Sequence, residues 1–148
     1  MIKIMRTTKD RRLVDLDEIK SGAWIHLLDP NDEELAYVKK HLHIEDEFLR
    51  AALDEEETVR IENEDGQTLV VVDIPVVSPE RGSFLYTTLP LGIILAGDNI
   101  VTVCLEETSI IEDFWNGRVK NFDTCKRSRF LLQILYRNAG NICSICVR

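Results

Sequence analysis

The chain has 148 residues, of which 45% are hydrophobic and 30% charged, and its formal net charge is −8. This length fits one domain with a core of ordinary size, and the composition excludes a wholly disordered chain. The negative charge argues against a nucleic-acid-binding protein, which needs a basic face to contact phosphates. It suits a soluble acidic domain and, as a weaker indication, one that concentrates cations.

The first part of the sequence predicts three strands. Ile2 and Ile4 alternate with charged residues, as in a strand with one buried face. A short apolar piece at 13–14 predicts a second strand, and the run from Trp24 to Leu28 predicts a buried third.

The acidic stretch 29–34 (DPNDEE) has two interpretations, a metal-binding loop or the boundary between a strand and a helix. Asp29 suits a helix N-cap, Pro30 the first helical position, and acidic residues in a first turn complement the helix dipole. Leu35, Val38 and Leu42 then recur at helical spacing. We therefore favour the structural interpretation. A second helix is predicted over residues 45–54.

Two hairpins and two helices are predicted in the remainder. An Asp65-Gly66 turn joins an alternating segment to the apolar run 69–77, which predicts a central strand covered on both faces. A turn at 97–99 joins the next pair of strands, and residues 110–121 and 129–147 predict helices. The expected fold is of the α/β (α+β) class, a three-layer α/β/α sandwich with a mixed sheet of about seven strands.

The sequence contains no standard catalytic signature, whether G-x-G-x-x-G, H-E-x-x-H or G-x-S-x-G, so no enzyme is expected. The four cysteines show no disulfide framework and predict free thiols in a cytosolic chain. The alternative for Cys143-x-x-Cys146, half of a zinc site, lacks a second cysteine pair. The apolar runs 69–77 and 89–96 are shorter than the roughly 20 residues of a membrane helix, which predicts a soluble chain.

Two further groups of polar residues have alternative interpretations. His41 and His43 are one residue apart at a predicted helix end, which favours surface histidines over a shared metal. The acidic run 54–57 is either a solvated helix end or a contact for a cation or another subunit, since negative charge there opposes the helix dipole.

Four segments together resemble the N-terminal cytoplasmic domain of CorA-type magnesium transporters. They are WIHLLDPNDEEL at 24–35, LHIEDEFLRAALDEEETVRIENEDGQTLVVVDIP at 42–75, LPLGIILAGDNIVTVCLEE at 89–107 and KRSRFLLQILYRNAGNICSICVR at 126–148. Their order and spacing carry the resemblance, which covers residues 20–148. It implies a cytoplasmic α/β/α regulatory domain over 1–128 and the start of a stalk helix over 129–148.

The resemblance implies a role in transport. The chain is expected to be the ion-sensing domain of a membrane transporter for Mg²⁺, with Co²⁺ and Ni²⁺ also accepted, and to lie at the cytoplasmic face of the cell membrane. Its expected partners are four further copies in a homopentamer, its own membrane helices beyond residue 148, and divalent cations, but no nucleic acid. The alternatives are a zinc transporter of the same superfamily and a soluble acidic protein-binding module.

One departure from the family concerns a metal site. Well-studied relatives often carry Glu-Asp on the second helix, and that Asp binds a regulatory divalent ion between subunits. Here the matching pair is Arg50-Ala51. Glu47 and Asp54 neighbour position 51 on a helix and are the candidate metal ligands, since Mg²⁺ often binds one or two carboxylates and waters. The alternative is that no ion binds there. No cofactor is required, and Mg²⁺ is the candidate regulatory ion.

Overall fold

Seven strands form one mixed sheet in the computed structural model, which describes residues 1–54, 59–77 and 86–146. Their order in the sheet is β2-β1-β3-β7-β6-β5-β4. β3 and β7 run parallel, and the other neighbouring strands are antiparallel. The strands are β1 (Ile2–Thr7), β2 (Leu13–Asp15), β3 (Trp24–Leu28), β4 (Arg60–Glu64), β5 (Gln67–Val77), β6 (Tyr86–Ala96) and β7 (Asn99–Cys104).

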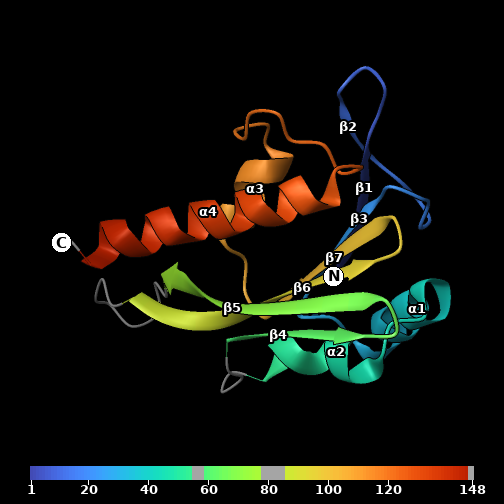
Figure 1. The fold of residues 1–148 in the computed structure, drawn as a ribbon, viewed down its shortest axis with the longest axis horizontal. Coiled ribbons are helices and arrows are strands. Elements are labelled where there is room, and N and C mark those ends of the chain that lie inside the picture. The colour runs from blue at the N-terminus through green and yellow to red at the C-terminus, as the bar shows by residue number, and fades with distance from the viewer. Residues whose placement is uncertain (55–58, 78–85, 147–148) are drawn as a thin grey trace.

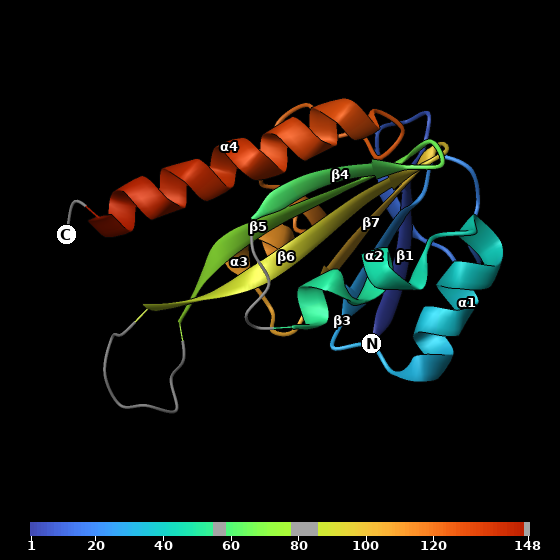
Figure 2. The same ribbon diagram turned by 60° about the horizontal axis from the view of Figure 1, so that its bottom comes forward.

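Helices cover both faces of this sheet (Figures 1 and 2). One face carries α1 (Asp32–Leu42), α2 (Asp46–Arg50) and the 3₁₀ turn η1 (Ala51–Leu53), and the other carries α3 (Ser109–Trp115) and α4 (Arg127–Cys146). The predicted three-layer α/β/α sandwich is confirmed. Within the described ranges, no helix is long and apolar enough to cross a membrane.

The core beneath α1 and α2 sets how closely the second helix approaches the sheet. Phe48, Leu49, Ala51 and Ala52 are all buried there. A Cβ atom added at Gly92 of β6 would lie 3.1 Å from the Cβ of Ala52. Because that spacing is tighter than ordinary van der Waals contact, η1 packs this closely only where β6 carries a glycine.

The opposite core is built around Trp24, which is fully buried, as predicted for the strand from Trp24 to Leu28. Its ring meets Phe114 of α3 and Phe130 of α4 edge to face, with centroids 6.4 and 4.8 Å away. Phe122, in the connection between those helices, meets Trp24 in the same way at 5.8 Å. Edge-to-face aromatic pairs contribute about 0.5–1.5 kcal/mol beyond their area burial. These rings therefore fix α3 and α4 on the sheet.

Three sequence predictions are corrected by the structure. The N-cap of α1 is Asn31 rather than Asp29, whose φ of 40° places it in the left-handed turn that ends β3. α3 ends at Trp115 rather than continuing to residue 121, because Gly117 has a φ of 76° and breaks the helix. β5 is covered on both faces near its start but lies beside the edge strand β4, so it is not central.

Candidate functional site: the outward face of α2

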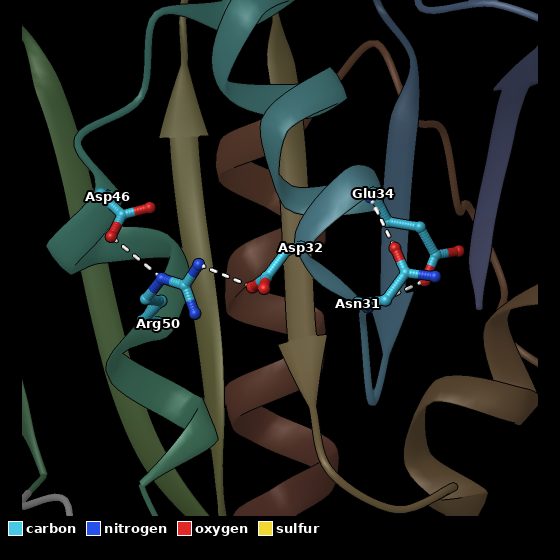
Figure 3. A network of polar contacts seen from close by, with 5 residues as sticks. All are labelled: Asn31, Asp32, Glu34, Asp46 and Arg50. Atoms are coloured by element: carbon cyan, nitrogen blue, oxygen red, sulfur yellow. Dashed lines mark hydrogen bonds and ion pairs between the residues drawn. The ribbon is translucent and has the colours of Figure 1, made fainter.

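Arg50 is the centre of a polar network between α1 and α2 (Figure 3). Its Nε donates to Asp46 Oδ2 at 2.9 Å, one helical turn earlier, and its Nη2 donates to Asp32 Oδ1 at 3.0 Å. Asp32 is the first residue of α1, so one guanidinium joins the first turns of two consecutive helices.

The electrostatics of this network are those of an exposed ion pair. Hydrogen bonds to Asp32 and then Asp46 raise the pKa of Arg50 above its usual value. The Arg50 side chain is 46% exposed and that of Asp32 89%, so water screens the attraction and the pairs add little stability. The chemical consequence is more important, because this fixed cation offsets part of the charge of two carboxylates, which makes them weaker attractors of a mobile cation.

Glu47 and Asp54, the predicted metal ligands, are both exposed on the outward side of this segment. Ala51, between them in sequence, is 5% exposed and packs into the core. The helix also tightens to a 3₁₀ turn at Ala51, which changes the angular spacing that an α-helix would give. Across the described residues, no three His, Cys, Asp or Glu side chains gather closely enough to hold a metal ion. Glu55, Glu56 and Glu57 lie outside the described residues.

The acidic stretch 29–34 has structural roles. The Asn31 side chain accepts a hydrogen bond from the Glu34 backbone N–H at 2.8 Å, and the Glu34 carboxylate accepts one from Asn31 N–H at 3.1 Å. This reciprocal pair is a capping box. The Glu34 carboxylate also accepts from the Met1 ammonium at 3.0 Å. The structural interpretation of the stretch is therefore confirmed, with Asn31 as the cap.

Sequence reasoning missed a buried polar cluster on β3 and β7. Trp24 Nε1 donates to Thr102 Oγ1 at 2.8 Å, and His26 Nδ1 lies 2.7 Å from the same oxygen. Burial, followed by the positive charges of Lys3 and the N-terminus, lowers the pKa of His26 from 6.5 to about 4. The ring is therefore neutral at pH 7, and the tautomer decides whether Nδ1 donates or accepts in the hydrogen bond with Thr102 Oγ1. The period-two pattern of β3 places Trp24 and His26 on one face, but Thr102 is 76 residues away from His26.

Among the side chains that the structure describes, the other histidines and the cysteines have no arrangement suited to metal binding. His41 Nδ1 contacts the Tyr37 carbonyl oxygen at 2.9 Å, and His43 is the left-handed C-cap of α1. Cys104 and Cys125 are free thiols, and burial raises the pKa of Cys104 to about 12. The side chains of Cys143 and Cys146 lie outside the part of the chain that the structure describes.

Residues 20–143 match the model of the CorA-like Mg²⁺ transporter protein family. The chain belongs to this family. It is 28% identical over 139 residues to the cobalt/magnesium transport protein CorA of Methanocaldococcus jannaschii, covering 90% of this chain and 41% of that protein. The resemblance to the N-terminal domain of CorA-type transporters, which the sequence suggested, is confirmed.

Solved CorA structures have the same fold. The soluble domain of M. jannaschii CorA superposes with a TM-score of 0.75 at 25% identity, covering 96% of this chain and 58% of that one. The complete M. jannaschii CorA magnesium transporter superposes with a TM-score of 0.79 at 22% identity. This match covers 98% of this chain and 46% of that one. The cytoplasmic domain of ZntB from Vibrio parahaemolyticus superposes with a TM-score of 0.72 at 12% identity. This match covers 97% of this chain and 59% of that one. The chain thus corresponds to the soluble domain of a CorA-like Mg²⁺ transporter and spans less than half of the curated relative.

Proposed function

We propose that this chain is the ion-sensing regulatory domain of a CorA-type membrane transporter that carries Mg²⁺ and accepts Co²⁺ and Ni²⁺. The observation that carries the proposal is the family match over residues 20–143 together with the fold shared with a CorA soluble domain. In this proposal, residues 129–148 begin the stalk helix, and the chain functions as a homopentamer at the cytoplasmic face of the membrane.

The physical basis of the regulation is electrostatic. A ring of five copies with a formal charge of −8 each repels itself, and divalent cations held between subunits offset that repulsion. Loss of the ions then favours a more open ring. Glu47 and Asp54 are exposed on the outward side of α2 and η1, where a carboxylate of a neighbouring copy can approach.

Arg50 gives this domain a feature of its own within the proposed scheme. It ties Asp32 and Asp46 into ion pairs within the domain, and Glu47 and Asp54, the ligands predicted from the sequence, stay the candidates of this segment. Two carboxylates with several bound waters make a weak Mg²⁺ site. We therefore expect the domain to sense Mg²⁺ at high rather than trace concentrations.

Transport is tested with the protein encoded by the complete reading frame, reconstituted in lipid vesicles. We expect that frame to contain, beyond residue 148, two apolar segments of about 20 residues each. Under an inside-negative potential, Mg²⁺ should enter the vesicles and Zn²⁺ should not. Entry of Zn²⁺ alone would favour the zinc transporter, and a frame without apolar segments would favour the soluble binding module.

The proposed metal site is tested by Glu47→Ala/Asp54→Ala in the same full-length protein. Mg²⁺ should raise the thermal unfolding temperature of the wild type, because it binds the assembled ring and not the unfolded chain. The double variant should lose most of that rise. The matched control is Glu106→Ala/Glu107→Ala, which removes two exposed carboxylates from the segment between β7 and α3. An equal rise in all three proteins would discard the site.

A further inference from the structure

Positive charge is concentrated on one corner of this acidic protein. The segments 6–12 and 118–129 contain nine of the chain's 18 Lys and Arg residues but only two of its 26 acidic residues, Asp10 and Asp123. The first segment is the end of β1 and the turn toward β2, and the second connects α3 to α4. Both lie on the side of the sheet covered by α3 and α4, remote from α2 (Figure 1).

Reciprocal hydrogen bonds hold these two segments together. Thr7 N–H donates to Thr124 Oγ1 at 2.8 Å, and Thr124 N–H donates to Thr7 Oγ1 at 3.0 Å. The Thr124 hydroxyl in turn donates to the Gly22 carbonyl oxygen at 2.8 Å, and both threonines are buried. Because these bonds are shielded from water, the basic segments keep a fixed separation.

Two adjoining cavities lie between the segments. The larger, of about 590 Å³, is lined by the basic residues Arg11 and Arg12 and by the aromatic residues Trp115 and Phe122, among others. The smaller, of about 270 Å³, is lined by Arg11, Lys126 and Arg129 and by the Asp123 carboxylate. Arg11, Asn121 and Phe122 line both cavities, so the two form one continuous site.

The cations of this site are available for a ligand. Arg11, Arg12, Lys126 and Arg129 form no ion pair with any residue that the structure describes, whereas Arg50, Arg60, Arg118 and Arg137 all do. One oxygen of the Asp123 carboxylate accepts a hydrogen bond from Cys125 N–H at 2.9 Å. Four cations around one partly engaged carboxylate give the site a positive balance.

We propose that this site binds an organic phosphate. Arginine binds phosphate through paired N–H donors in a planar fork, and Arg11 and Arg12 both line the larger cavity. The cavity has the volume of a typical small-molecule site, which is larger than one phosphate needs. Trp115 and Phe122 supply an apolar wall for the organic part, and the Asn121 side chain supplies a polar group. This anion site is separate from cation sensing and does not depend on it.

The test is calorimetric titration of the 148-residue chain with adenosine monophosphate and with glycerol 3-phosphate, without Mg²⁺. A parallel sedimentation assay uses vesicles of phosphatidylglycerol and of phosphatidylcholine, which separates a lipid headgroup from a free organic phosphate as the source. We expect saturable binding of a soluble phosphate, or binding to the phosphatidylglycerol vesicles alone. The Arg11→Gln/Arg12→Gln variant should bind about tenfold or more weakly, as expected when charge-assisted hydrogen bonds are lost.

The matched control is Lys39→Gln/Lys40→Gln, which removes the same charge from the exposed end of α1 and should bind like the wild type. The Lys126→Gln/Arg129→Gln variant removes two cations of the site near the start of α4. It replaces the Arg11/Arg12 variant in the binding assays if that variant does not fold. Absence of binding with every probe would overturn the proposal. Equal weakening in the Arg11/Arg12 and Lys39/Lys40 variants would overturn it too, since net charge alone would then explain the affinity.

Discussion

His26 shows how a single buried side chain couples the fold to pH. The imidazole is 1% exposed, contacts Thr102 Oγ1, and has Lys3 as a nearby positive charge. Protonation would put a second cation into this buried layer, close to that of Lys3. The pKa of His26 is lowered because burying the charged ring is unfavourable.

The stability of the protein should fall on acidification because of His26. Its pKa is 6.5 in the unfolded chain and about 4 in the folded one, so between these pH values the unfolded chain binds more protons. Neutral His26 therefore contributes about 3 kcal/mol to the free energy of unfolding above pH 6.5. This contribution is lost as the pH falls through 4. Urea unfolding of wild type and His26→Gln at pH 7 and pH 4 measures it. The variant should lose about 3 kcal/mol less between the two pH values, and an equal loss would contradict this account.

Arg50 illustrates what a residue's charge alone does not reveal. Its place on the second helix was evident from the sequence, as was the absence of the family's acidic pair there. The ion pair with Asp32 was not, because that carboxylate is 18 residues away and meets Arg50 only when α1 and α2 pack side by side. Contacts between separate helices depend on the fold and have no local sequence signature.

Among the elements, α1 shows which signals mark a helix end. Asp29 and Asn31 are both good caps by residue type, and Pro30 between them suits a first helical position. The capping box distinguishes them, because Glu34 lies three residues after Asn31. α3 shows how an apolar pattern can make a predicted helix too long. Val119 packs against the same core as α3 from an irregular connection, so its apolar character falsely extends the helical pattern past Gly117.

The capping box gives a prediction for α1. Asn31→Ala removes the acceptor for the Glu34 N–H and should lower the free energy of unfolding by about 1 kcal/mol. Glu33→Ala, in the same first turn, removes only an interaction with the helix dipole and should cost a few tenths of a kcal/mol. Chemical denaturation of the two variants makes the comparison. Equal stabilities would mean that Asn31 does not cap the helix.

At the scale of the whole molecule, the layers were predictable and the order of the strands was not. Apolar runs and turn residues located all seven strands and the two hairpins that β4–β5 and β6–β7 form. The parallel pairing of β3 with β7 joins residues 24–28 to 100–104 and has no local signal, which is why β5 was misplaced at the centre. The basic site on the α3–α4 side was missed for the same reason, since its two segments are more than 100 residues apart.

The two proposed sites lie on opposite sides of the molecule and differ in charge. Arg50 and the exposed carboxylates Glu47 and Asp54 lie with α2 on one side of the sheet, and the proposed phosphate site lies on the other. The net charge of −8 averages over both sides and therefore predicts only the cation-attracting one. The family match motivates the proposal for the first side and is silent on the second.

The central claim, an ion-sensing domain of a Mg²⁺ transporter, is tested most directly by one flux measurement. Mg²⁺ influx through the full-length protein in vesicles is recorded while the Mg²⁺ concentration on the side of this domain is raised in steps, at constant driving force. The account predicts that influx falls as that concentration rises, because cations bridging the copies favour the closed ring. Influx that does not change with Mg²⁺ on the domain side would contradict it.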